Sequence, residues 1–368
     1  MKRLLLTKEF NMIKYYWNLL NKRKDILMNS IDREWVENHI DSNGEVVIPD
    51  GVEKIEPMAF AKNDKVKKIV MPDTVTEIGD KAFALCPNLK EIEFSSNLKI
   101  IGTSAFYGCS SLTTINLPES LETIEQSAFS KCSQLSSVSL GDNVKEIKPL
   151  AFRGCAIEHI TLPDSLTKLD IGVFQECVNL IEINGGNNLN EVDAYAFKNT
   201  SLSEYRIPDD VSSILATAFS NNPNFSHITL NKNLDFLSER AFDGCDNIQE
   251  VTIDGTQRIN YGAFLGKSTI RKVTIDDQEF ILPENEQLLS IQKSGEKVAI
   301  VIQDENGKFS SKAISLEKRT QKVIPNNLYL TDDGKPCYAM NNLAEISLER
   351  IRKIKKCWIN TNVYLWWR

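Results

Sequence analysis

Apolar and polar residues follow one another along this chain in a pattern that returns every 22 or 23 residues. The phenylalanines of successive units fall at positions 60, 83, 106, 129, 152, 174, 197, 219, 242 and 264. The apolar set of one unit comprises Leu112, Ile115, Leu117, Leu121, Ile124, Ala128, Phe129 and Cys132. A fixed period of this length indicates a repeat architecture. Since a unit this short cannot shield its apolar set alone, we expect neighbouring units to stack.

Within each unit, the segment equivalent to residues 112–117 alternates apolar and polar positions with a period of two. This alternation predicts a strand with one face inward. Aligned in parallel, the strands would form one long sheet that advances about 4.8 Å per repeat. Pro118 and Pro163 follow such strands, where a missing N–H does no harm. The Ala-Phe corner, as in Ser104–Cys109, is predicted to be a short helical turn, with the phenylalanines stacked inside as a column.

Written in full, the unit is Leu-x-x-Ile-x-Leu-Pro-x-x-Val/Leu-x-x-Ile-Gly-x-x-Ala-Phe-x-x-Cys, repeated from about Val46 to Ile275. This pattern resembles the BspA-like (Treponema pallidum-type) leucine-rich repeats. The sequence departs from it at Val173-Phe174, which replaces Ala-Phe, and at Thr256 and Lys267 in the last unit. The resemblance implies an α/β solenoid: a curved leucine-rich-repeat array of about ten repeats with a parallel β-sheet on its concave face. It also implies a binding surface, because members of this family are mostly bacterial or protist surface and host-interaction proteins.

Three regions are predicted: an N-terminal helical cap (1–44), the solenoid (45–283) and a small C-terminal α+β accessory region (284–368). Apolar residues at helical spacing over residues 8–40 indicate one or two amphipathic helices that cap the first repeat, with a membrane-surface helix as the alternative. In the C-terminal region, a hairpin with an Asn306-Gly307 turn is expected to precede a basic helix over about 342–357. That helix could contact anionic lipid or an acidic partner, and it is the only membrane contact expected if residues 8–40 form a cap.

The composition limits the kinds of partner that the chain can bind. A net charge of −7 and a pI near 5.3 argue against non-specific binding of nucleic acid. The sequence contains no run of 18 or more apolar residues, so no membrane-spanning helix is predicted. The first ten residues hold only three consecutive leucines, short of the core of an export signal. The compartment therefore stays open between the cell surface or secretion, as the family implies, and the cytoplasm.

Six of the eight cysteines occupy one repeat position: Cys86, Cys109, Cys132, Cys155, Cys177 and Cys245. They are predicted to be a column of free, buried thiols. Parallel side-chain vectors disfavour disulfides between neighbours, and the absence of a Cys-x-x-Cys pair disfavours a metal. A disulfide or a metal is the less favoured alternative.

The candidate binding site is the outward face of the predicted sheet, where residues at the third and fifth positions of Leu-x-x-Ile-x-Leu form two ladders. A small, uncharged middle part lies beside a later part that carries Glu158 and other glutamates. We predict a hydrogen-bonding strip next to an acidic patch, suited to a basic or polar partner segment. Thr and Ser are also good strand formers on any solvated face. The predicted partner-binding residues are Glu91, Glu93, Thr114, Asn116, Ser137, Ser139, His159, Thr161, Glu182, Glu204, Arg206, His227 and Glu250.

Catalytic and cofactor chemistry is not expected. His159 and His227 occupy equivalent positions three repeats apart, roughly 14 Å, which is too far for one metal. The segment from Gly262 to Ser268 is one residue short of a phosphate-binding loop and is simply the tenth corner. We therefore predict a non-enzymatic, monomeric interaction protein with no cofactor, whose ligand is a polypeptide such as an extracellular-matrix or host protein. The alternative is an intracellular effector or adaptor whose repeats hold a partner for the C-terminal region.

Overall fold

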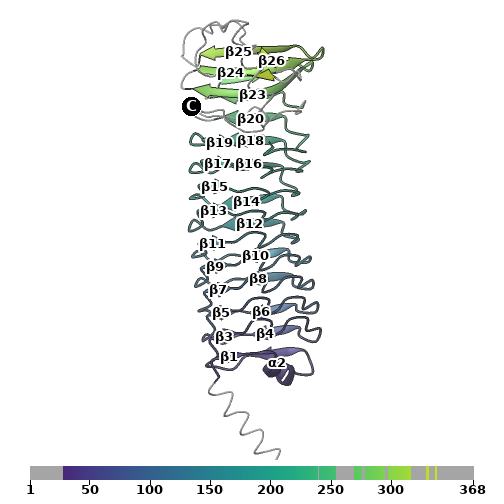
Figure 1. Cartoon of the computed structure of the whole chain (residues 1–368), viewed down its shortest axis with the longest axis vertical. Helices are drawn as coiled ribbons and strands as arrows, with labels where there is room; N and C mark the ends of the chain where they lie inside the picture. Colours follow the sequence, from purple (N-terminus) through teal and green to yellow (C-terminus); the bar gives the residue numbers. More distant parts are fainter. Residues whose placement is uncertain are drawn as a thin grey trace, which may run out of the picture.

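The protein is described by a computed structural model that covers residues 28–238, 240–253, 269–275, 278–294, 297–315, 329–330 and 336–337. Its turns stack one above another along the long axis, with helix α2 (Arg33–His39) at one end and a three-stranded sheet at the other (Figure 1). The predicted parallel-strand solenoid is confirmed. No helix among the described residues has the length and apolar character needed to cross a bilayer.

The predicted strand of each unit forms a column of parallel strands of three or four residues, which we call the long-strand column. The column is not the single long sheet that the sequence predicted, because its strands pair within four separate hydrogen-bonded groups. Its inward residues are buried or, at Ile92, Val138 and Ile183, partly buried, and its outward residues are mostly exposed, as in Thr114–Asn116. Antiparallel β22 (Gln278–Ile281) ends the column. The parallel members are β2 (Glu45–Val47), β4 (Lys68–Val70), β6 (Glu91–Glu93), β8 (Thr114–Asn116), β10 (Ser137–Ser139), β12 (His159–Leu162), β14 (Glu182–Gly185), β16 (Glu204–Arg206), β18 (His227–Leu230), β20 (Glu250–Ile253) and β21 (Lys272–Ile275).

A second column of two-residue parallel strands runs beside the first, and the sequence did not predict it. Two residues are too few to show a period, although each strand ends in a buried aliphatic residue such as Ile78. The members of this short-strand column are β1 (Ser30–Ile31), β3 (Lys54–Ile55), β5 (Glu77–Ile78), β7 (Ile100–Ile101), β9 (Thr123–Ile124), β11 (Glu146–Ile147), β13 (Lys168–Leu169), β15 (Glu191–Val192), β17 (Ser213–Ile214) and β19 (Phe236–Leu237).

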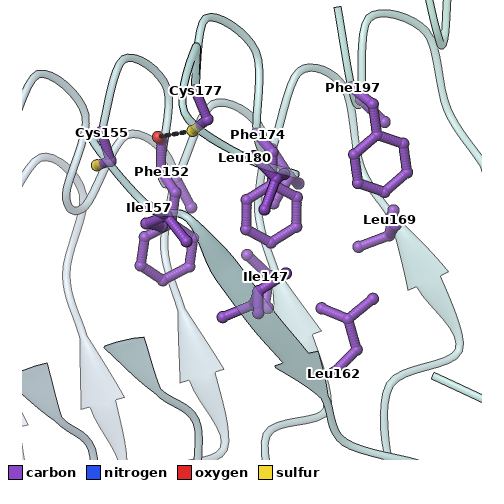
Figure 2. Packing of buried hydrophobic residues seen from close by; sticks show 14 of the residues in the cluster. Ile147, Phe152, Cys155, Ile157, Leu162, Leu169, Phe174, Cys177, Leu180 and Phe197 are labelled. Atoms are coloured by element: carbon purple, nitrogen blue, oxygen red, sulfur yellow. Dashed lines mark hydrogen bonds between the residues drawn. The ribbon is translucent and has the colours of Figure 1, made fainter. Parts of the chain in front are cut away.

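The core between the two columns is built around stacked rings. From Phe60 to Phe242 successive ring centroids lie 4.5 to 5.8 Å apart. Figure 2 shows Phe152, Phe174 and Phe197 in this column, with aliphatic residues such as Leu169 beside it. The predicted phenylalanine column is therefore present, and it ties each turn to both of its neighbours.

The Ala-Phe corner is not the helical turn that the sequence predicted. Ser104 has φ of 55° and Gly108 has φ of 70°, both left-handed. Between them the N–H groups alternate: that of Ala105 donates to Gly102 O in the same turn (3.1 Å), whereas that of Phe106 donates to Ala128 O in the next turn (2.7 Å). The corner is thus a run of β-turns that also extends the inter-turn hydrogen bonding.

At the N-terminal end, α2 covers the first turns. The Asp32 carboxylate accepts the Trp35 N–H (3.0 Å) as a helix cap, and Trp35 and Val36 are buried in the common core. The Arg33 guanidinium donates to Ala61 O (2.8 Å). The earlier part of the predicted helical cap, residues 1–27, lies outside the described residues.

At the other end, β23 (Glu286–Ser294), β24 (Lys297–Asp304) and β25 (Phe309–Ser315) form an antiparallel sheet, and β26 (Tyr329–Leu330) pairs with β27 (Pro336–Cys337). Residues 298–302 of β24 are all buried. Three of them, Val298, Ile300 and Ile302, share the core of the solenoid. The predicted helix at 342–357 and the tenth corner at 262–268 lie outside the described residues, and the region boundaries at 44 and 283 stay predictions.

Candidate functional site: the outward face of the long strands

The candidate residues all lie on the outward face of the long-strand column. Residues of adjacent strands stand side by side in parallel register, as Ser137 does with Thr114 and Ser139 with Asn116. The third-position ladder continues through Glu204, His227 and Glu250 as direct neighbours. The alignment of the predicted residues along one face is therefore present in the structure.

The first part of this face is charged and internally paired. Lys68 Nζ lies 2.7 Å from Glu93 and 3.9 Å from Glu45. The hydrogen bond and charge of Glu93 raise the pKa of Lys68. Of the acidic residues here, Glu91 is exposed and forms no ion pair with a described residue.

The central part is uncharged and unpaired. Five ladder positions on three adjacent strands carry hydroxyl or amide side chains that are exposed to solvent. None of these side chains forms a hydrogen bond with another described residue. We call this set the central strip; it consists of Thr114, Asn116, Ser137, Ser139 and Thr161.

Beyond the central strip the predicted acidic patch is partly neutralised. Glu182 lies 2.9 Å from His159 Nδ1 and accepts a hydrogen bond from Asn184 (3.1 Å). These bonds, from Asn184 first and His159 second, lower the pKa of Glu182. Glu204 is exposed and has no ion-pair partner among the described residues, whereas Arg206 pairs with Asp209 (3.4 Å). The free negative charge is therefore smaller than the sequence suggested, and it lies on Glu204 and on Glu158, which is also exposed and has no ion-pair partner among the described residues.

In the last part of the face, the side chains again form hydrogen bonds and ion pairs with one another. His227 Nε2 lies 3.1 Å from Thr252 Oγ1 and 3.3 Å from Thr229 Oγ1. Lys272 Nζ contacts Glu279 (2.7 Å) and Glu250 (2.9 Å), and these two carboxylates raise its pKa. Across the described part of the chain, no cluster of three or more His, Cys, Asp or Glu residues could hold a metal ion.

The cysteine column contributes packing. All six of its thiols are free and buried, as the sequence predicted. Each Sγ donates to the carbonyl of a phenylalanine in an adjacent turn at 3.0 to 3.2 Å, as Cys177 does with Phe152 (Figure 2). Burial raises the pKa of Cys177 to about 12, so this thiol is protonated at neutral pH. Asn222 takes the same position in its turn and donates to Phe197 O and Phe219 O.

Comparison with known proteins identifies the repeat. The family model described as "BspA type Leucine rich repeat region (6 copies)" matches residues 30–158 and 145–271. This chain belongs to the BspA-type leucine-rich-repeat family. The BspA-type repeat is a protein-interaction fold, and its relatives are generally non-enzymatic scaffolds. No curated protein matches the sequence.

A solved leucine-rich-repeat structure shares the fold. A leucine-rich repeat protein from Bacteroides ovatus is 27% identical with a TM-score of 0.55, over 64% of this chain and 63% of that one. The T. pallidum Leucine Rich Repeat protein is 36% identical with a TM-score of 0.39, over 41% of this chain and 72% of that one. The chain thus spans less than two thirds of the length of the Bacteroides relative.

Proposed function

We propose that this chain is a non-enzymatic protein-binding solenoid that holds an extended polypeptide segment on the central strip. The observation that carries the proposal is the contrast along the long-strand face. The central strip presents unpaired, exposed hydroxyl and amide groups, while the charged residues before and after it largely pair with one another. Such groups both donate and accept hydrogen bonds, which suits them to the N–H and C=O groups of a peptide.

The position of Glu204 adds a second feature to the expected partner. Its strand follows that of Thr161 by two turns, about 10 Å along the solenoid. A partner segment that crosses the strands from the central strip would reach this carboxylate within three or four extended residues. We therefore expect an uncharged polar segment with a lysine or arginine at one end. A surface or host-interaction role, as the family resemblance implies, forms part of this proposal.

The test is capture of partners by the purified chain from two pools, a cell lysate and extracellular-matrix proteins. Two double variants are compared with the parent chain. One places arginines on the central strip (Thr114→Arg with Ser137→Arg), and the matched control places them on the short-strand column (Thr123→Arg with Ser213→Arg). All four positions are at least partly exposed, so thermal unfolding should change little in either variant.

We expect a partner that the parent chain and the control retain and that the central-strip variant loses at least tenfold. Equal capture by both variants would place binding elsewhere. A matrix partner would support the surface role. A lysate partner that also needs residues 284–368 would instead support the adaptor alternative.

A further inference from the structure

The long-strand column is interrupted at three places, which we call the pairing breaks. They lie between β6 and β8, between β10 and β12, and between β14 and β16, where adjacent strands share no hydrogen-bonded ladder. The corners remain bonded across every break, because the N–H groups of Phe106, Phe152 and Phe197 donate to the next turn at 2.7 to 3.0 Å. The turns therefore stay stacked although their long strands do not pair.

Each break follows a strand whose consensus proline is replaced. Ser95, Gly141 and Gly186 take its place after β6, β10 and β14. The strands that keep the proline, β2, β4, β8, β12 and β16, all pair with the next strand. After β18, where Asn231 replaces the proline, pairing continues and the Asn231 side chain donates to Val211 O (2.9 Å) in the same turn. From β6 to β14 the breaks therefore recur at every second turn, at positions where the sequence departs from its own repeat.

Backbone donors that are bonded within the strand pairs are left unpaired at the breaks. Across β8 and β10, the Ser136 N–H donates to Thr113 O (3.0 Å). The equivalent N–H groups at the three breaks form no hydrogen bond with a described residue; they are those of Thr113, Glu158 and Ser203. Each break therefore offers a backbone donor to a ligand.

Each break also uncovers apolar side chains of the core. Ile92, Val138 and Ile183 point inward from the strands before the breaks, and all three are partly exposed. At the same position in strands that pair on both sides, Ile69 and Ile228 are fully buried. The two strands that border a break thus present an apolar surface and an unpaired N–H together.

The face around the second and third breaks is acidic. Between the corners and the short strands of five successive turns there are nine acidic and two basic side chains, a net charge of −7. These stretches are residues 110–122, 133–145, 156–167, 178–190 and 201–212. The rest of residues 110–212 carries six acidic and five basic side chains, so the neighbouring corners and short strands do not cancel the charge. A partner that carries lysine or arginine complements this face.

The spacing of the breaks indicates the conformation of a ligand. Consecutive breaks lie two turns apart, about 10 Å along the solenoid. In a polyproline II helix, side chains on one face recur every three residues, about 9.3 Å. An α-helix returns to the same face after seven residues, about 10.5 Å, but its carbonyl groups are bonded internally. A polyproline II segment has no internal hydrogen bonds, so its carbonyls are free to accept from the donors at the breaks.

We propose that the pairing breaks are three subsites for a polyproline II segment of a partner polypeptide, with an apolar side chain at every third position and lysine or arginine between them. The apolar side chains cover Ile92, Val138 and Ile183, and the carbonyls accept from the unpaired N–H groups. The inference rests on the proposed function, because the second break crosses the central strip. It adds the conformation and the sequence period of the ligand.

The experiment is fluorescence anisotropy of the full chain with labelled peptides. The probe has four repeats of Leu-Pro-Lys. One comparison peptide has the same composition with its leucines grouped out of period, and another has serine in place of leucine. The break variant is Val138→Thr. Its matched control, Val251→Thr, makes the same change at a buried position of β20, which pairs on both sides.

We expect the periodic peptide to bind at least tenfold more tightly than either comparison peptide. Val138→Thr should weaken that binding about fivefold, because a methyl group that contacts the ligand is replaced by a hydroxyl. Val251→Thr should leave the affinity unchanged, although it should lower the melting temperature at least as much. Equal affinity for the periodic and out-of-period peptides, or equal loss of affinity in both variants, would overturn the proposal.

The central-strip variant, Thr114→Arg with Ser137→Arg, separates this inference from the proposed function. If it loses captured partners while the periodic peptide binds no better than the comparison peptides, the subsites are refuted and the central strip stands. If it keeps the affinity for the periodic peptide while Val138→Thr lowers it, the subsites stand and the role of the central strip is refuted.

Discussion

The phenylalanine column allows a prediction that separates burial from stacking. Phe129 is fully buried, and its ring is parallel to those of Phe106 (5.1 Å, 3°) and Phe152 (5.4 Å, 2°). Phe60 is buried to the same degree, but it stacks on a single described ring, that of Phe83 (4.5 Å). Both alanine substitutions therefore remove a buried phenylalanine ring, but Phe129→Ala removes two stacking contacts and Phe60→Ala removes one.

Truncation of a buried phenylalanine costs about 3–5 kcal/mol. Each aromatic pair adds about 0.5–1.5 kcal/mol beyond area burial. We therefore expect Phe60→Ala to lower the free energy of unfolding by about 3 kcal/mol and Phe129→Ala by about 4 kcal/mol. The difference, about 1 kcal/mol, measures the second stacked ring.

Urea unfolding followed by far-ultraviolet circular dichroism measures both variants. Because neighbouring turns are coupled only through their interfaces, Phe129→Ala should also reduce the steepness of the transition if the two halves begin to unfold separately. A cost for Phe129→Ala no larger than that for Phe60→Ala would refute the stacking argument.

Three further outcomes follow from single positions. Lys131→Gly should raise the free energy of unfolding by about 0.5–1 kcal/mol, because Lys131 has a left-handed backbone and glycine occupies the equivalent position at Gly108. Urea unfolding measures this change, and the control variant Lys145→Gly, at a position without a left-handed backbone, should be destabilising. The Tyr205 hydroxyl is buried without a hydrogen-bond partner among the described residues, so Tyr205→Phe should stabilise by about 1 kcal/mol, and an unchanged or lower melting temperature would contradict this. Burial raises the pKa of Cys177 to about 12, above the pKa of the thiol in the unfolded chain. The stability that the buried, protonated thiol provides is therefore fully present below the unfolded-state pKa. Above that pKa the unfolded thiol ionises first, and the free energy of unfolding falls by about 1.4 kcal/mol per pH unit. From pH 8 to 10 the parent chain should therefore lose more stability than Cys177→Ala, and identical losses would be the contrary result.

The repeat pattern was enough to predict the long strands and their neighbours. Alternation decides which side chains face the core, and a slip of one residue would expose Ile115 and bury Thr114. The same logic makes His159 and Glu182 direct neighbours, 23 residues apart, so their contact could have been anticipated. Tyr205 likewise stands at an inward position of the alternation in Glu204–Arg206, and 7% of its surface is exposed.

Other features depend on information that a period does not contain. The left-handed corner positions are occupied by Lys81 and Leu85 as well as by Gly108, so the residue type does not reveal the left-handed backbone. The pairing of Lys272 with Glu279 requires the reversal of direction at β22, which lies beyond the last repeat. Charge within the candidate site was therefore harder to predict than its alignment.

The direction of the inter-turn hydrogen bonds has a mechanical consequence. Bonds such as that from Phe106 N–H to Ala128 O join one turn to the next, so they lie along the long axis of the stack. A force that pulls the two ends apart loads these bonds in tension, one turn at a time, instead of shearing many together. Each released turn of 23 residues adds about 75 Å of chain, so the array would lengthen in regular steps under low force. A partner held on one part of the face could remain bound while turns at the far end peel away, and the solenoid would act as an extensible tether.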